Sequence, residues 1–407
     1  MTAVDAQFYW MSAKIPNDQF LLYAFAGVPD DLDAAVADVL DRARRSPELM
    51  VRVADSDPLR YPRWVPTAVP LCAVRHQLGD DTWTGCLDAV VRLADDQLDP
   101  RCATWRLHVF APVRGVPGQP GAGAVAVLQV AHALADGVRA SALAGWLFGR
   151  AEPVAPVAGP RPGFLPRRAV EAAREHRRQV SDIRAGRCPE PMPDRQPLAT
   201  NDRPAGARTV RTLVRRRSEW PGPTVTVGAL AAISAALSQY LGPGCQSLGA
   251  EVPMAKATAR RANNHFGNVR VGLHPQLPWQ LRTERIAADL EAARRRAQHP
   301  ATRSADRAFA AVPAVLLRWG VSQFDPDLRP ARVGGNTVVS SVHRGPADLA
   351  FGAAPVVLTA GFPALSPAMA LTHGVHGIGD TIVLSVHAAA SAIPDVDEYL
   401  GLLDARL

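Results

Sequence analysis

The sequence predicts a protein of mixed α/β (α+β) class, built from two halves that a linker joins. Its 407 residues, of which 47% are hydrophobic, are enough to bury two cores of ordinary size. Alternating strand and helix patterns occur before the linker and start again after it. The segment between them is rich in Arg and Pro. We therefore expect sub-domains at 1–155 and 208–407, with 156–207 as the linker.

The elements of the first half follow from local signals. Residues 30–46 predict a helix, because Asp residues stand at its start and Arg residues at its end, as the helix dipole favours. Residues 104–113 predict a strand, and the unbroken apolar run at 125–131 predicts a buried one. A helix is expected at 138–149. The loop between the second strand and this helix should therefore lie at the mouth of a sheet, where side chains face a cleft.

The linker and the second half can be divided in the same way. Residues 151–166 are rich in Pro and Gly, 167–186 predict an Arg-rich amphipathic helix, and 188–207 predict an extended segment. The second half then alternates again. Its expected strands are 208–215, 246–252, 268–274, 337–342, 356–361, 370–377 and 382–388, and its expected helices are 224–241, 281–297, 304–319 and 395–406.

The positive charge is concentrated in one segment. The chain has a net charge of +7, whereas residues 161–217 hold 15 Arg against six Asp and Glu, a local net charge of +9. Phe164 is the only aromatic residue in that segment, which argues against nucleic acid as a partner. Two interpretations stay open: a solvated linker, or a surface that binds phosphates or an anionic membrane.

Cysteine usage and hydropathy bear on the compartment. No apolar run reaches the length of a membrane span, and the N-terminal residues lack the pattern of a signal peptide. The cysteine count is odd and no CxxC pair occurs, so we expect reduced thiols in a cytoplasmic monomer. The five cysteines are Cys72, Cys86, Cys102, Cys188 and Cys245.

One motif points to chemistry. His132, Asp136 and Gly137 form an HxxxDG string in the loop after the buried strand. Histidine titrates nearest to neutral pH, so it suits the general base that acyl transfer from a thioester requires. Asp136 could orient the imidazole or pair with an arginine, and Gly137 permits backbone torsions that other residues resist. On spacing alone, an ordinary turn remains an equal interpretation.

The segment HALADG resembles the second half of the HHxxxDG signature of the coenzyme A-dependent acyltransferase superfamily. Further segments, in the same order, are similar to those of its wax ester synthase/diacylglycerol acyltransferase (WS/DGAT) group and cover nearly the whole chain. These segments are VDAQFYW (4–10), LDPRCATWRLHVF (98–110), PLATNDRPAGARTVRTL (197–213), EVPM (251–254), FGN (266–268), LP (277–278) and VVSSVHRGP (338–346).

The resemblance implies two chloramphenicol acetyltransferase-like sub-domains with an active-site tunnel at their interface. It implies that His132 is the general base of a direct transfer from acyl-CoA to a hydroxyl or amine. Asp136 would be structural, paired with an arginine that the sequence does not identify. Acyl-CoA would be a substrate, with no further cofactor and no metal, and the acceptor would be a lipid or a specialised metabolite, as in wax ester or triacylglycerol synthesis.

The chain also departs from the family pattern. Ala131 replaces the first motif histidine, Thr226 and Val227 replace an Asn-Asp pair, and Ser341 replaces an Asn. Two alternatives therefore remain beside the CoA-dependent enzyme. One is a condensation-type enzyme whose acyl donor sits on an acyl carrier protein. The other is a non-catalytic homologue that binds lipid or acyl chains.

Three further residues are candidates for the tunnel wall. Asn268 belongs to the FGN segment, and Ser340 and Ser341 could offer a hydroxyl to a developing oxyanion. Each could equally be an ordinary strand residue.

Three histidines, His373, His376 and His387, invite a metal-site interpretation. The first two are three residues apart on an expected strand, which puts them on opposite faces, and no carboxylates cluster with them. The sequence therefore gives no metal site. It also contains no phosphate-binding loop and no serine-hydrolase motif.

Overall fold

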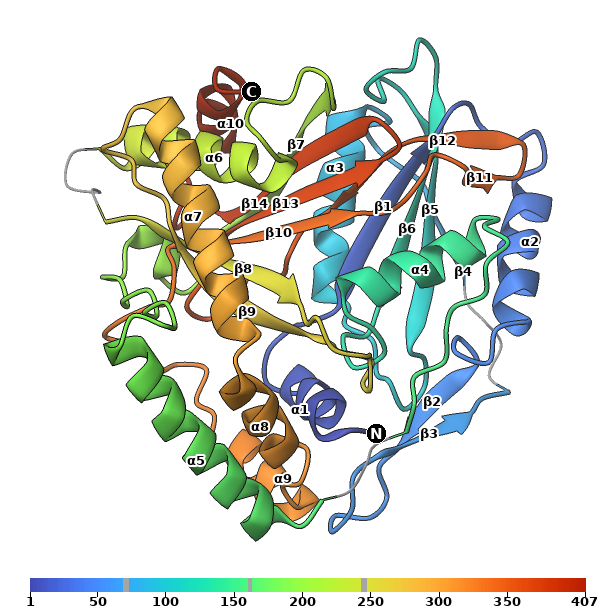
Figure 1. Ribbon diagram of the computed structural model, residues 1–407. Coiled ribbons are helices and arrows are strands. Elements are labelled where there is room, and N and C mark those ends of the chain that lie inside the picture. The colour runs from blue at the N-terminus through green and yellow to red at the C-terminus, as the bar shows by residue number, and fades with distance from the viewer. Residues whose placement is uncertain (69–72, 160–162, 243–246) are drawn as a thin grey trace.

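The computed structural model describes residues 1–68, 73–159, 163–242 and 247–407 and arranges them in two lobes, each with a six-stranded sheet (Figure 1). Helices pack on both sheets, so the expected α/β class with two halves is confirmed. The expected strand at 246–252 begins with a residue outside the described ranges. No helix in the described residues is long and apolar enough to cross a bilayer.

The first sheet has the strand order β11-β12-β1-β6-β5-β4. Its strands are β1 (Gln19–Phe25), β4 (Ala73–His76), β5 (Trp105–Val113), β6 (Gly123–Val130), β11 (Ala350–Phe351) and β12 (Ala354–Gly361). All neighbouring strands are antiparallel except β4 and β5. Helices α2 (Leu32–Arg44) and α4 (Gly137–Leu147) cover one face of this sheet, and α3 (Trp83–Arg92) covers the other.

The second sheet has the strand order β7-β14-β13-β10-β8-β9. Its strands are β7 (Arg208–Arg216), β8 (Gly249–Ala255), β9 (Phe266–Gly272), β10 (Thr337–His343), β13 (Leu371–Ile378) and β14 (Thr381–Ala389). Strand β10 is parallel to both of its neighbours. Helices α6 (Val225–Leu241), α7 (Trp279–Ala297) and α10 (Val396–Asp404) contribute to the core on this sheet.

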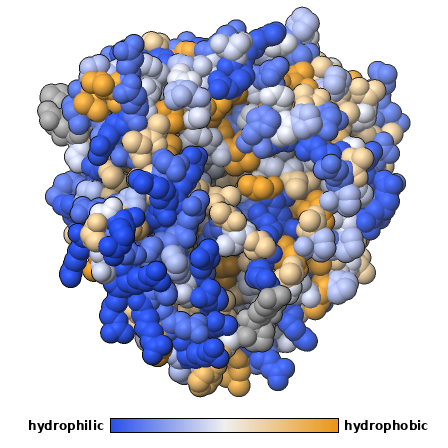
Figure 2. Space-filling model, in the orientation of Figure 1, coloured by the Kyte–Doolittle hydropathy of each residue, from blue (hydrophilic) through white to orange (hydrophobic). Residues whose placement is uncertain are grey.

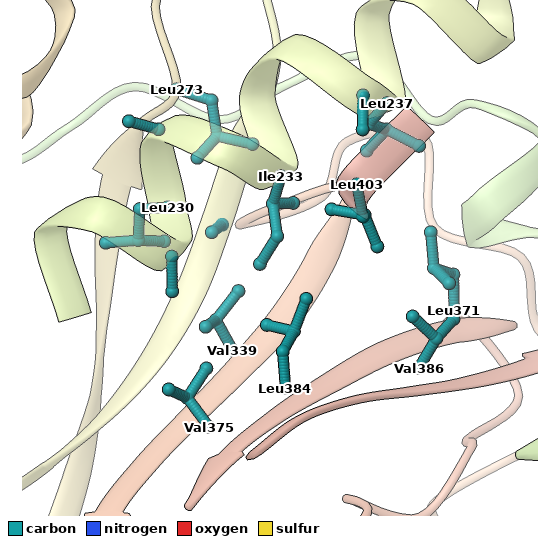
Figure 3. Close-up of a cluster of buried hydrophobic side chains, with 14 of the residues drawn as sticks. Leu230, Ile233, Leu237, Leu273, Val339, Leu371, Val375, Leu384, Val386 and Leu403 are labelled. Carbon is teal, nitrogen blue, oxygen red and sulfur yellow. The ribbon is translucent and has the colours of Figure 1, made fainter. Parts of the chain in front are cut away.

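The core of the second lobe explains why α6 forms where it does. Thr224 caps the helix by accepting a hydrogen bond from the backbone N–H of Val227 at 3.2 Å. Leu230, Ile233 and Leu237, spaced to share one face, lie above the strand side chains of the sheet (Figure 3). Burying each of these side chains stabilises the fold by about 1.5–3 kcal/mol.

Four helices lie away from the sheet cores, in the lower part of Figure 1. Helix α1 (Ala3–Ser12) packs against α9 (Ala314–Ser322), and α5 (Leu165–Arg184) runs along α8 (Pro300–Phe309). The single helix expected at 304–319 is therefore wrong. Two helices occur there, because Pro313, which has no N–H, stands at the N-cap of α9 and starts it afresh.

The two sheets meet where β12 crosses β13 and β14. The hydroxyl of Ser385 donates to the carbonyl oxygen of Gly361 at 2.6 Å, and a Cβ on Gly374 would lie 2.0 Å from that same oxygen. Only glycine fits this approach. Because β11 and β12 belong to the first sheet, residues 350–361 do not follow the expected assignment of 208–407 to the second lobe. The remaining boundaries stay a prediction.

Most expected elements are present within a few residues of their predicted ends. Among the described residues, the helices and strands that local patterns did not predict are α1, β1, β4, α3, β11 and the two-stranded sheet of β2 (Val51–Ala54) and β3 (Arg63–Pro66). Cys86, Cys102 and Cys188 are free thiols. Cys72 and Cys245 lie outside the described residues.

Candidate active site

The HxxxDG loop connects β6 to α4 and is held at both ends. Every residue of β6 is buried, as its apolar run predicts. At the other end, the carboxylate of Asp136 caps α4 by accepting from the backbone N–H of Arg139 at 2.9 Å. Within this buried loop the side chain of His132 keeps partial exposure. The loop therefore presents one histidine to solvent at a fixed position.

The imidazole of His132 is oriented by Asn264. The Oδ1 atom of Asn264 lies 2.9 Å from Nδ1 of His132, and its Nδ2 donates to the carbonyl oxygen of His132 at 2.8 Å. Nδ2 also donates to Asp5 at 3.1 Å, so the amide can only offer its oxygen to the ring. Nδ1 must then carry the proton. The lone pair is on Nε2, which has no hydrogen-bond partner among the described residues.

Residues of helix α1 contact both Asn264 and His132. Asp5 accepts from the backbone N–H groups of Asn263 and Asn264 at 3.1 and 2.9 Å, and Phe8 stacks on the imidazole with ring centroids 4.1 Å apart. Burial raises the pKa of Asp5. Burial also lowers the pKa of His132, which the hydrogen bond that its Nδ1–H donates to Asn264 and the charge of Asp136 partly oppose. The imidazole is therefore neutral at neutral pH and has a lone pair that can accept a proton.

Asp136 forms an ion pair with an arginine that could not be identified from the sequence. Arg260 binds its carboxylate through both terminal nitrogens, at 2.9 and 3.1 Å, and the backbone N–H of His265 donates to it at 2.8 Å. The carboxylate is almost fully buried. Since Arg260 and His265 follow β8, the pair ties the first lobe to the second beside His132. Asp136 makes no hydrogen bond to the imidazole.

A pocket of about 490 Å³ lies between the lobes. Its wall includes every residue that the sequence proposed for the site, namely His132, Asp136, Gly137, Asn268, Ser340 and Ser341. A second pocket, of about 400 Å³, shares Phe20 and Phe362 with it, and a third, of about 510 Å³, shares Ala255 and Asn268. The pocket that contains His132 therefore adjoins a second pocket on the side of Phe20 and a third on the side of Asn268.

The three candidate wall residues differ in their surroundings. Ser340 has no hydrogen-bond partner among the described residues, whereas the hydroxyl of Ser341 lies 2.9 Å from that of Thr226 on α6. Asn268 is exposed, and its amide donates to Glu251 at 3.4 Å. Ser340 is therefore the hydroxyl that is free to serve a ligand.

The prediction that Gly137 is needed for a backbone conformation that other residues resist is wrong. Its backbone has no positive φ, because it is the first residue of α4, and a Cβ there would meet Val342 at an ordinary 3.5 Å. Gly137 instead lines the pocket, where any longer side chain would occupy space that a ligand needs.

His373 and His376 point to opposite sides of β13, as expected. His373 contacts Thr337 and Tyr399 in the core, with ring nitrogens 2.8 and 3.0 Å from their hydroxyl oxygens, while His376 lines the pocket. The residues that sequence reasoning missed are Asp5, Phe8, Asn264 and Arg260. The first two lie in a segment noticed only for its resemblance, and no local pattern marks the others.

No family model matches the chain, and no curated protein sequence matches it. Solved structures do match the chain. The wax ester synthase/diacylglycerol acyltransferase from Marinobacter aquaeolei VT8 superposes with a TM-score of 0.64 and 18% identity, covering 99% of this chain and 96% of that one. A variant of the starter condensation domain of rhizomide synthetase RzmA, in complex with C8-CoA and Leu-SNAC, gives 0.59 and 13%, covering 100% and 93%.

The chain has the fold that these two proteins share. The likeness runs over the full length of the chain and confirms, at the level of the fold, the resemblance noted in the sequence. At 18% and 13% identity, this likeness concerns the fold.

Proposed function

We propose that the protein is an acyltransferase that moves an acyl group from acyl-CoA onto a hydroxyl or amine, with His132 as general base. The observation that supports this best is the state of the imidazole. Asn264 holds the proton on Nδ1, and Nε2, with its lone pair, belongs to a residue that lines the pocket between the lobes. The similarity to a wax ester synthase/diacylglycerol acyltransferase and to a domain bound to C8-CoA agrees with this chemistry.

The proposed reaction is a direct transfer. The acceptor oxygen or nitrogen attacks the thioester carbonyl carbon while Nε2 of His132 takes its proton, which gives a tetrahedral oxyanion. The hydroxyl of Ser340, in the same pocket, is placed to donate to that oxyanion. Collapse breaks the C–S bond, and the imidazolium returns the proton to the departing CoA thiolate. The sequence of steps needs no metal and no redox cofactor.

One histidine suffices for this mechanism. Ala131, at the position of the first motif histidine, is fully buried, and its backbone N–H donates to the carbonyl of Thr104 at 3.0 Å. It is not part of the pocket wall. The departure at Ala131 therefore leaves the proposed base and its pocket unchanged.

The donor is proposed to be CoA rather than a carrier protein. The pocket that adjoins Asn268 is lined by Lys256, Arg294, Arg296 and Arg303, against one acid, Asp306. Several cations at one entrance suit the several phosphates of CoA better than the single phosphate of a carrier-bound arm. A wild-type enzyme that accepts carrier-bound acyl groups and rejects acyl-CoA would instead assign it to the condensation type.

Release of free thiol from acyl-CoA, with a panel of alcohols and amines as acceptors, tests the proposal. We expect acceptor-dependent release, and a loss of roughly 10²- to 10⁴-fold in His132→Ala. His176→Ala is the matched control, since His176 is exposed on α5 and lines none of the three pockets. If His132→Ala keeps more than half of the wild-type rate, His132 is not the base. If the wild type binds acyl-CoA and never releases thiol, the protein is a binding homologue.

A further inference from the structure

Three arginines are buried among the described residues, and they differ in what neutralises them. Arg139, Arg282 and Arg344 are 4%, 9% and 5% exposed. Arg139 forms an ion pair with Glu48. The guanidinium of Arg282 donates to four backbone carbonyl oxygens, those of Ala231, His274, Pro275 and Leu277. Both charges are therefore compensated by the protein, as burial requires.

Arg344 is the exception. Only one of its guanidinium nitrogens, Nη1, has partners, which are the hydroxyl of Thr359 and the carbonyl oxygen of Ala360. Nε is buried without a partner, and no described group accepts from Nη2. No carboxylate pairs with it in the described residues; its remaining neighbour is the ring of Tyr23, 5.2 Å from the guanidinium carbon. A full positive charge is thus buried with three of its five N–H donors unused.

One of the nitrogens with unused donors, Nη2, lies beside the wall of the central pocket. Arg344 and Gly361 both line it, and a methyl group on Gly361 would meet Nη2 of Arg344 at 2.7 Å and the ring of His376 at 3.1 Å. The ring atom Nδ1 of His376 is also buried without a partner among the described residues. Gly361 therefore leaves room for two nitrogen-bearing side chains to meet at one point of the wall.

The acids in the same wall are already engaged. Asp136 is paired with Arg260. Asp18 accepts from the backbone N–H of Leu98 at 2.7 Å and from Gln129 at 2.8 Å, and burial raises its pKa to about 6. Neither acid makes a hydrogen bond or ion pair with Arg344 in the described residues.

We propose that Arg344 binds a carboxylate on the substrate, so that the pocket takes a molecule with a carboxylate at one end and the reacting group at the other. Nη2 offers two unused N–H donors beside Gly361, and a carboxylate oxygen accepts from a guanidinium nitrogen in a charge-assisted hydrogen bond. The apolar wall, with Phe8, Phe266 and Phe362, takes the chain between the two groups. The inference rests on the proposed acyl transfer and adds the substrate class to it.

A binding experiment tests the carboxylate site without turnover. Dissociation constants of hexanoate and hexanamide, which differ in charge and hardly in shape, are measured by calorimetry on the full chain. The wild type should bind hexanoate roughly 10- to 100-fold more tightly, because the charge-assisted hydrogen bond to Arg344 is lost with the amide. His132→Ala should keep this preference. If thiol release fails while the preference is present, the proposed function is wrong and the carboxylate site stands.

Arg344→Met should abolish the preference, and Arg282→Met, which removes an equally buried but fully partnered arginine, should keep it. Arg344→Lys keeps the charge without the paired donors and should retain only part of it. The wild-type measurement decides the matter even if a variant does not fold. Equal binding of hexanoate and hexanamide by the wild type, or an unchanged preference in Arg344→Met, overturns the proposal.

Turnover then assigns the carboxylate to acceptor or donor. The first pair of reactions compares 6-hydroxyhexanoate with its methyl ester as acceptor, and the second compares adipyl-CoA with hexanoyl-CoA as donor. We expect kcat/KM for the acid of one pair to exceed that for its neutral partner roughly 10- to 100-fold, and this ratio to collapse in Arg344→Met. The pair of reactions that shows this ratio identifies whether the carboxylate belongs to the acceptor or to the donor. A ratio near one in both pairs of an active wild type contradicts the inference.

Discussion

Replacing Asn264 by Ala should slow the chemical step while leaving the fold in place. The substitution removes the oxygen that accepts from Nδ1 of His132 and the N–H that donates to the His132 carbonyl. The carboxylate of Asp5, also a partner of the amide, keeps the hydroxyl of Thr2 at 2.7 Å and two backbone N–H groups. No buried charge loses its last partner, so the variant should fold.

The size of the effect follows from the two hydrogen bonds to His132. Each contributes about 0.5–1.5 kcal/mol, so their joint loss corresponds to roughly 5- to 100-fold in kcat/KM. The loss should appear in kcat, because Asn264 holds the base and does not line the pocket. Since its hydrogen bond raises the pKa of His132, the acid limb of the pH profile should move to lower pH in the variant.

The assay is thiol release from acyl-CoA under saturating and limiting acceptor, from pH 5 to 8. Asn263→Ala is the matched control, because this neighbouring amide makes one long contact, 3.4 Å to the carbonyl of Ala133, and none to His132. An Asn264→Ala enzyme with raised KM, unchanged kcat and an unmoved pH profile would refute the assignment of Asn264 as the positioning residue.

Three further outcomes follow. Asp136→Asn should lower the free energy of unfolding by about 3 kcal/mol, because Arg260 loses its buried counter-charge; thermal unfolding measures this loss. The same substitution should change kcat/KM for thiol release less than tenfold. The free energy of unfolding should decrease as the pH falls from about 6.5 to 5, by up to ~2 kcal/mol for each buried histidine, and denaturant unfolding between pH 7 and 5 measures this. Burial lowers the folded-state pKa of these histidines below the unfolded value, so only the unfolded chain takes up their protons in this range. They are His108, His373, His376 and His387. The KM for acyl-CoA should rise with salt, because Lys256, Arg294, Arg296 and Arg303 line the pocket proposed to hold the CoA phosphates; a KM that does not change with salt would contradict this assignment.

The structure narrows the role of the Arg-rich segment 161–217. Many of its arginines pair with acids of other elements, as Arg208 does with Asp95 and Arg215 with Asp404. Helix α5 lies at the outer surface, where hydrophilic residues gather in Figure 2, and contributes nothing to the three pockets. Within the described part of this segment, residues from 203–208 line one of the three pockets, and both of their arginines are paired, Arg203 with Asp327 and Arg208 with Asp95. Helix α5 remains available to an anionic surface.

Local pattern was enough for most helices and strands but not for the site around His132. Caps and periodicity act over a few neighbouring residues, so α4 and its Asp136 cap could be read from the chain. The partners of the motif come from far away: Arg260 and Asn264 lie in the loop after β8, and Asp5 lies on α1. No propensity links such positions, because only the packing of the lobes brings them together.

The departures from the family pattern bear directly on whether the chain kept its chemistry. Thr226 and Ser341, which replace two family asparagines, lie in contact, with hydroxyl oxygens 2.9 Å apart, so the pair still joins α6 to β10. Ala131 is buried outside the pocket, while His132 keeps a fixed tautomer. A held imidazole with an unpartnered Nε2 suits a general base, and a hydroxyl such as that of Ser340, without a partner among the described residues, suits an oxyanion donor; binding an acyl chain alone requires neither. We therefore favour turnover over binding alone, and thiol release from acyl-CoA decides between them.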